Sequence, residues 1–241
     1  MIDKIKFYQK KLSISNSLMD ICDGLEFRSK EQFLMDLLEE LYKERLERSR
    51  ERKLKAAKFP VVKTLNGYDF TDIIFPEKLT IEQLKGLNFI ENKQNLIFYG
   101  GPGAGKTHLG IALGTMAINN QKSVLFYTVH SLINELVKAK EEHSHEKLMK
   151  KIEKADLLIL DEWGYLPLHQ EGARLLFEVI SLCYERKSII ITTNMEFNHW
   201  KNFLFDEKLT VAIIDRLVHH SHLLFFDRES HRKKHALMKQ G

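Results

Sequence analysis

The chain after Asn95 alternates short runs of consecutive apolar residues with longer amphipathic segments. The apolar runs predict strands over 96–100, 124–129, 157–160, 188–193 and 222–226. The segments between them predict helices over 105–118, after 129 through about 140, over 171–186 and over 210–219. Because the strands are apolar throughout, we expect both faces of the sheet to be covered. Strands and helices in alternation predict an α/β fold with a parallel, doubly wound sheet of five strands, whose ligand lies at their carboxyl ends.

The pattern before residue 59 is helical. Apolar residues recur there at helical spacing and predict one apolar face: Phe33, Leu37 and Leu41, flanked by Leu34, Leu38 and Tyr42. Ser29 and Gln32 have the spacing of a capping box, in which each side chain bonds the other residue's backbone N–H. Pro60 ends the helix, because the residue before a proline disfavours the α region. We therefore divide the chain into a helical region over 1–58, a linker with short helices over 59–94, and an α/β domain over 95–241.

Composition restricts the class of protein. Apolar residues make up 44% of the chain, which is enough for a globular core. Cys22 and Cys183 form no disulfide framework and no zinc pattern, so we expect thiols in a reducing cytoplasm. No apolar run approaches the roughly 18 residues of a membrane span, so no membrane contact is predicted.

Charge is unevenly distributed, although the formal net charge is only +4. The segment 43–58 holds eight Lys or Arg against three Glu, and the tail from Arg228 to Gly241 holds five against Glu229 alone. A charged helix is most often a solvated face. Two basic clusters that flank a core of nearly balanced charge instead favour contact with the phosphates of DNA.

A glycine-rich segment lies between the first predicted strand and the helix that follows it. Its residues match the phosphate-loop pattern: Gly100, Gly101, Pro102, Gly103, Ala104, Gly105, Lys106 and Thr107, followed by His108. The backbone N–H groups of such a loop cradle the phosphates of ATP. Lys106 is then expected to reach the β- and γ-phosphates and Thr107 to bind Mg²⁺. The alternative, a glycine-rich turn with a chance lysine, explains neither the strand–loop–helix context nor the second motif.

That second motif is a pair of acids at the end of the strand 157–160. Asp161 stands where a carboxylate would hold the Mg²⁺, and Glu162 is placed to activate the attacking water. A strand that merely ends in a polar turn is the plainer explanation. Two adjacent acids downstream of a phosphate loop favour the catalytic one.

Two further residues are candidates by position alone. Asn194 follows the strand 188–193, where its amide could bond the γ-phosphate and the attacking water, although asparagine is also common in turns. Arg216 could act as an arginine finger on a neighbouring subunit's γ-phosphate. The alternative for Arg216 is a solvated surface charge or a partner of Asp215.

The motifs together resemble a known family. The phosphate loop, the acidic strand end, Asn194 and Arg216 occur in the order and spacing of AAA+ ATPases. The segments GYLPL (164–168), ITTN (191–194) and DRLVHHSH (215–222) are similar to those of the IstB family, the ATPase helpers of insertion-sequence transposases, which are related to DnaC-type helicase loaders. The segment AAKFPVVKTLNGYDF (56–70) also resembles that family's linker. The resemblance covers nearly the whole chain.

The resemblance implies an AAA+ core with little or no lid domain, ATP-dependent oligomerisation on duplex DNA, and cooperation with a transposase of the IstA type. It implies a sensor role for Asn194 and a finger role for Arg216. At the C-terminal end, Ser230-His231-Arg232 stands where the family commonly has Ser-Tyr-Arg, so no nucleotide-sensing role is assigned to Arg232.

Two other functions remain open at this point. A replicative helicase loader would use the same ATPase with a different partner; loaders with an N-terminal zinc cluster are excluded, because that region holds only Cys22. A nucleotide-gated DNA-binding scaffold that barely hydrolyses ATP is the third class, against which Glu162 argues. We expect largely non-specific contacts with the DNA backbone in each case.

Overall fold

The computed structural model describes residues 2–227, and the chain divides into two compact units, Met1–Lys53 and Leu54–Gly241. The basic tail from Arg228 onward, with Arg232 in it, lies outside the described residues. No helix between residues 2 and 227 combines the length and the apolar character that crossing a membrane requires.

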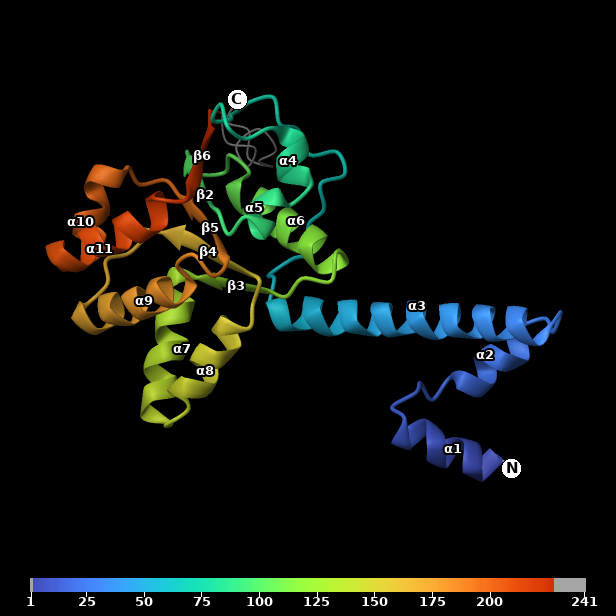
Figure 1. The fold of residues 1–241 in the computed structure, drawn as a ribbon. Coiled ribbons are helices and arrows are strands. Elements are labelled where there is room, and N and C mark those ends of the chain that lie inside the picture. The colour runs from blue at the N-terminus through green and yellow to red at the C-terminus, as the bar shows by residue number, and fades with distance from the viewer. Residues whose placement is uncertain (1, 228–241) are drawn as a thin grey trace, which may run out of the picture. The chain divides into compact units, whose positions relative to one another are not determined.

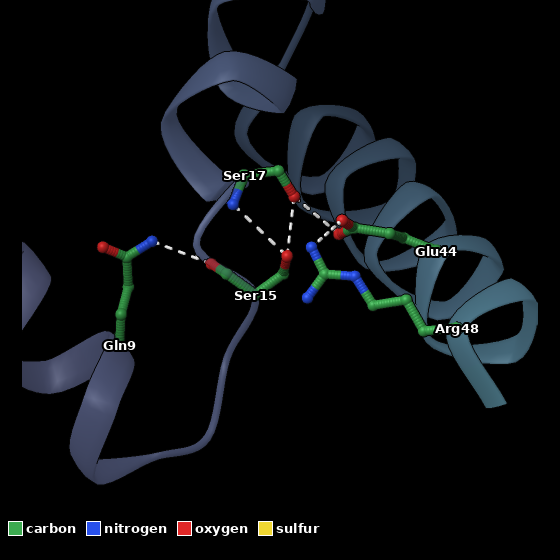
Figure 2. Close-up of polar contacts among 5 residues, drawn as sticks. All are labelled: Gln9, Ser15, Ser17, Glu44 and Arg48. Carbon is green, nitrogen blue, oxygen red and sulfur yellow. Dashed lines mark hydrogen bonds and ion pairs between the residues drawn. The ribbon is translucent and has the colours of Figure 1, made fainter. Parts of the chain in front are cut away.

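The first unit contains α1 (Ile2–Lys11), α2 (Leu18–Gly24) and most of α3 (Lys30–Ala57). Polar contacts join the loop after α1 to α3, as Figure 2 shows. The Ser17 hydroxyl donates to Glu44 over 2.6 Å, and Arg48 pairs with the same carboxylate at 2.5 Å. Gln9 donates its side-chain amide to the Ser15 carbonyl at 2.9 Å. The bonds of Glu44 connect the loop after α1 to the middle of α3.

The predicted cap of α3 is half correct. The Ser29 hydroxyl accepts a bond from the Gln32 backbone N–H at 3.1 Å. The Gln32 side chain does not return to Ser29 but donates to Asp36 at 2.7 Å, one turn along the helix. The predicted end near Pro60 is confirmed, because α3 stops at Ala57 and Lys58 takes a left-handed φ of 60°.

The apolar face predicted for α3 is only partly covered. Phe33, Leu37 and Leu41 are half-buried. Leu34, Leu38 and Tyr42 are more than half exposed. The helical spacing thus correctly identified an apolar face, while its burial in this chain is incomplete.

The second unit is built on one six-stranded sheet in the order β1-β6-β2-β5-β4-β3 (Figure 1). Its strands are β1 (Ile73–Ile74), β2 (Asn95–Gly100), β3 (Val124–Thr128), β4 (Leu157–Trp163), β5 (Ser188–Thr193) and β6 (Ser221–Phe226). The five predicted strands are present and parallel, which confirms the α/β fold. The sequence did not predict β1, which adds an antiparallel edge to β6. A strand of two residues is too short to show any periodicity.

Two apolar clusters cover the two faces of the sheet. Successive residues of a strand belong to different clusters, because their side chains point to opposite sides of the sheet. Along β4, Leu157 and Ile159 belong to the cluster that contains α6 (Lys106–Asn119), α4 (Ile81–Lys85) and α5 (Asn88–Glu91). Leu158 and Leu160 belong to the other cluster. That cluster contains residues of α7 (Val129–Glu141), α8 (His145–Glu153), α9 (Gln170–Cys183), α10 (Trp200–Phe203) and α11 (Glu207–Val218). The uninterrupted apolar strands follow from this double coverage.

The helices differ from the prediction in number and at some of their ends, since α9 stops at Cys183 rather than at 186 and α11 begins at Glu207 rather than at 210. The helix expected to run through about 140 is followed by a separate helix, α8, after a turn at His143 with a φ of 55°. The short helix η1 (Phe197–His199) and α10 also fill a region where no helix was predicted. Both cysteines are free, and burial raises the pKa of the Cys183 thiol to about 12.

Candidate nucleotide-binding site

The glycine-rich loop leaves β2 and enters α6 through backbone that favours glycine. Gly100, Gly103 and Gly105 have φ values of 153°, 78° and 94°, in the region that other residues rarely adopt. A Cβ atom on Gly100 would also collide with the backbone carbonyl of Phe226 at the end of β6. The spacing of these glycines is therefore a requirement of the turn itself, and the helix begins directly after it at Lys106.

The side chain of Lys106 contacts the backbone of this loop. Its ammonium group donates to the carbonyls of Gly100 and Gly101, each at 2.7 Å, and only 9% of the residue is exposed. The two carbonyls hold the positive charge beside the backbone N–H groups at the start of α6. An anionic ligand at this helix N-terminus would meet a lysine that is already in position.

Asp161 is the centre of a buried hydrogen-bond cluster at the end of β4. Its Oδ1 atom accepts a bond from the Thr107 hydroxyl at 2.8 Å and a second bond from the Thr192 hydroxyl. Only 6% of Asp161 is exposed. The cluster joins the start of α6 to the ends of β4 and β5, so the phosphate loop and the acidic strand end form one site.

Glu162 lies in an irregular stretch of β4, where the register with β5 shifts between Leu160 and Trp163. Its φ of 59° is unusual for a residue with a side chain. Its N–H donates to the Thr192 hydroxyl at 3.2 Å, and its side chain is exposed while Asp161 beside it is buried. Strained backbone of this kind persists only where its surroundings hold it, and it is concentrated at functional sites.

Comparison with known proteins settles the family. The sequence matches the family described as IstB-like ATP binding protein over residues 22–239. The chain belongs to this family.

Named relatives come from insertion sequences. An IS21 ATP-binding protein of Pseudomonas aeruginosa is 42% identical over 203 residues, which are 84% of this chain and 77% of that protein. An IS5376 ATP-binding protein of Geobacillus stearothermophilus is 38% identical over 209 residues, or 87% of this chain and 83% of that protein. The crystal structure of the DnaC helicase loader is similar in fold, with a TM-score of 0.52 and 21% identity over 73% of this chain and 98% of that one. This IstB-like protein therefore belongs to an ATP-binding family, and its P-loop core has a fold similar to that of the DnaC helicase loader.

Asn194 and Arg216 of this IstB-like protein lie in different surroundings. Asn194 is exposed directly after β5, on the same rim of the sheet as Asp161. Arg216, on α11, donates to the Ala212 carbonyl at 2.9 Å and stacks over the Phe177 ring of α9 at 4.9 Å. Of the two alternatives to a finger role, pairing with Asp215 is not the contact that the arginine makes. Arg216 thus contacts its own helix and α9, whereas the phosphate loop contacts β4 and the linker.

The linker contributes contacts to the site that the sequence did not predict. The Tyr68 hydroxyl donates to the Gly105 carbonyl at 3.3 Å, and its ring lies 5.2 Å from that of His108. The His108 Nε2 atom lies 3.3 Å from the Thr64 carbonyl oxygen. The aromatic segment before β1 therefore packs against the phosphate loop.

Thr192 is another residue of the site that the sequence analysis did not identify. Its hydroxyl donates to Asp161 and accepts from the Glu162 N–H, so one side chain fixes both acids. The signal was present in ITTN, because a polar residue at the end of a buried strand needs a partner. A threonine in a strand is so common, however, that it drew no attention beside Asn194.

Proposed function

We propose that this IstB-like protein hydrolyses Mg²⁺-ATP and, assembled on duplex DNA, assists the transposase of its insertion sequence. The observation that carries the proposal is the convergence of Thr107, Asp161 and Glu162 beside a formed phosphate loop. The family and the insertion-sequence relatives supply the biological setting.

The metal-binding part of the proposal rests on two oxygen atoms. The Thr107 hydroxyl and the Asp161 carboxylate lie 2.8 Å apart, and oxygen ligands are those that Mg²⁺ prefers. Mg²⁺ usually binds through one or two protein oxygens together with phosphates and water, so these two side chains suffice. The ion would neutralise charge that develops on the phosphates.

The hydrolytic part assigns a task to each remaining side chain. Lys106, with the backbone N–H groups of Gly101 and of the residues from Gly103 to His108, binds the phosphates. The exposed carboxylate of Glu162 takes a proton from the attacking water, and Asn194 on the same rim bonds that water and the γ-phosphate. The Thr192 hydroxyl accepts the Glu162 N–H and so fixes the backbone of Glu162. The Glu162 carboxylate stays outside the buried cluster.

The assembly part of the proposal assigns Arg216 to a neighbouring subunit's nucleotide. Support comes from its position on α11, where it is half-buried and forms no ion pair with any residue between 2 and 227. An arginine supplied in this way contributes ~10³–10⁵ in rate. Hydrolysis would then require a homo-oligomer.

The DNA-binding part rests on α3. Several of its basic side chains form ion pairs within the helix, as Arg48 does with Glu44 and Arg50 with Glu47. Such exposed pairs contribute only about 0–1 kcal/mol, so DNA phosphates can replace the glutamates. Every subunit added to an ATP-linked assembly brings another such helix to the same duplex and raises the avidity.

The test is a salt titration of duplex binding by fluorescence anisotropy, with and without a non-hydrolysable ATP analogue. We expect tighter binding with the analogue, and an affinity that falls steeply with salt because counterions are released. Replacing Arg45, Arg52 and Lys55 by glutamine should flatten the salt slope for all sequences alike. The matched control neutralises Lys4, Lys6 and Lys10 of α1, which removes the same amount of charge from the same helical region over 1–58.

Equal duplex affinity in both nucleotide states contradicts the link between ATP and DNA. Equal loss in the two triple variants means that net charge, and not α3, attracts the duplex. The partner is tested by co-purification with the transposase of the same insertion sequence and, in parallel, with the host's replicative helicase. Capture of the helicase alone would replace the transposition role by loading.

A further inference from the structure

A group of potential metal ligands lies at the amino ends of the parallel strands, across the sheet from the phosphate loop. Glu185 stands between α9 and β5, and His219 and His220 stand between α11 and β6. One ligand atom from each of the three residues lies within 4.8 Å of the others. The His220 Nε2 atom is 3.1 Å from a Glu185 carboxylate oxygen. The two histidines belong to the DRLVHHSH segment, and the nucleotide chemistry gives them no task.

The backbone that carries these side chains is anchored. The backbone N–H of Asn95 donates to the His220 carbonyl at 2.7 Å, and its buried side chain donates to the Leu217 carbonyl at 3.1 Å. The same side chain accepts the Ile189 N–H at 2.9 Å. One residue therefore fixes the end of α11, the start of β5 and the start of β2 relative to each other. Ligands on fixed backbone need little reorganisation to bind a metal.

The electrostatic setting favours a cation. Helices α9 and α11 pack side by side (Figure 1) and end beside the cluster, at Cys183 and Val218, so their negative dipole ends meet there.

The basic residues near the cluster differ in how they are held. Arg186 is exposed. Lys187 bonds the carbonyls of Ile152 and Glu153 at the end of α8, and Arg216 stacks over Phe177. The Lys187 ammonium is thus bonded to the end of α8, and the Arg216 guanidinium contacts two neutral groups, the Ala212 carbonyl and the Phe177 ring.

We propose that Glu185, His219 and His220 form a site for a divalent transition-metal ion of the Zn²⁺ class. Two imidazoles and one carboxylate are a ligand set that zinc accepts, with water in the remaining position. Zinc–ligand bonds of about 2.0–2.2 Å place tetrahedral ligands roughly 3.3 Å apart. The Glu185–His220 pair already has that separation, so the adjustment falls mainly on the exposed ring of His219.

A contact outside the three ligands orients one of them. The Tyr184 hydroxyl lies 3.1 Å from Nδ1 of His219, and a ligating histidine usually has such a partner on its other nitrogen. Nε2 of His219 is then the atom that binds the ion. The ion would join the end of α9 to the end of α11, the two helices that carry Phe177 and Arg216.

The site can be tested without nucleotide, on full-length protein that carries no histidine tag and has been stripped of metal by a chelator. Calorimetric titration with ZnCl₂ should give one saturable site per chain, and Co²⁺ should give the visible absorption of a four- or five-coordinate ion. Changing Glu185, His219 or His220 singly to glutamine should weaken Zn²⁺ binding by more than about tenfold, the loss that even an outer partner of a ligand causes. The matched control is His169→Gln, an exposed histidine at the other end of α9.

Zn²⁺ should also raise the unfolding temperature of the parent protein and of His169→Gln, and leave that of the three ligand variants unchanged, because only folded protein presents the site. All four positions are exposed, and circular dichroism checks each fold. The proposal is overturned if the parent protein shows no saturable site. It is equally overturned if the control loses as much affinity as the ligand variants, or if the ligand variants lose none.

Discussion

The nucleotide site and the N-terminal helical unit hold their charged side chains in different ways. Around the phosphate loop, Lys106 and Asp161 are buried, and each is bonded to atoms of neighbouring elements. On α3, Arg48 is exposed and Arg50 is partly exposed, and both are paired with glutamates of their own helix. Chemistry on one phosphate needs atoms fixed before the ligand arrives. Binding to a uniform line of phosphates needs charge that can adjust.

The largest effect should come from removing the positive charge of Lys106 from the nucleotide site. Lys106→Ala should abolish detectable ATP binding while the fold remains, because the ammonium group is bonded to the Gly100 and Gly101 carbonyls of the loop and contributes little to the core. Fluorescent ATP-analogue binding and circular dichroism measure the two properties. Lys201→Ala, at an exposed position on α10, is the control. Near-normal affinity in Lys106→Ala would refute the phosphate-loop assignment.

A variant of Arg216 tests whether one chain contains every residue that the nucleotide site needs for hydrolysis. Arg216→Ala alone should lower kcat by ~10³–10⁵. Mixing it with Lys106→Ala should restore part of the activity, since some interfaces then join an intact phosphate loop to an intact arginine. Phosphate release by the mixture is the measurement. Full activity of Arg216→Ala on its own would place this arginine outside the reaction.

Thr192 tests how far catalysis depends on the bonds that fix the two acids. Thr192→Val keeps the shape but removes a bond to a charged group, which is worth about 1.5–3 kcal/mol. We therefore expect kcat to fall by roughly 10- to 100-fold, with ATP affinity little changed. Thr193→Val is the matched control, because its hydroxyl bonds the Trp163 carbonyl and neither acid. The same loss in both variants would attribute the effect to strand packing.

The smallest effect concerns the helical unit. Hydroxyl bonds from Ser15 and Ser17, and then Arg48, hold the pKa of Glu44 below its ordinary value of 4.5. Its contribution to stability is therefore present above that value and is lost as the pH falls through the lower folded pKa. Amide-exchange protection of α1 and α2 should be lower in Glu44→Gln than in the parent protein at pH 7, and the two should converge at about pH 3. Glu39→Gln, elsewhere on α3, should show the same protection as the parent protein at both pH values. A difference between Glu44→Gln and the parent protein that is as large at pH 3 as at pH 7 would contradict this account.

Much of the fixed region was predictable, because its backbone demands particular residues. Glycines at Gly103 and Gly105 and an acid at the end of a buried strand are visible in one sequence. Strand β1 was not predictable, since two residues show no period, nor was α8, since a turn at His143 carries no glycine or proline. The contacts of Thr192 depend on which strand lies beside β4, and the role proposed for Arg216 depends on a second copy of the chain. Contacts across strands or between chains leave no local pattern.

The most direct test of the account is phosphate release by Glu162→Gln. The central claim is that Glu162, held in its strained position by Thr192, activates water for attack on ATP. The variant should bind Mg²⁺-ATP with unchanged affinity, lose ~10²–10⁴ in kcat and accumulate as an ATP-bound assembly. Glu171→Gln, an exposed acid in the first turn of α9, should behave as the parent protein does. An unaltered kcat in Glu162→Gln would contradict the claim.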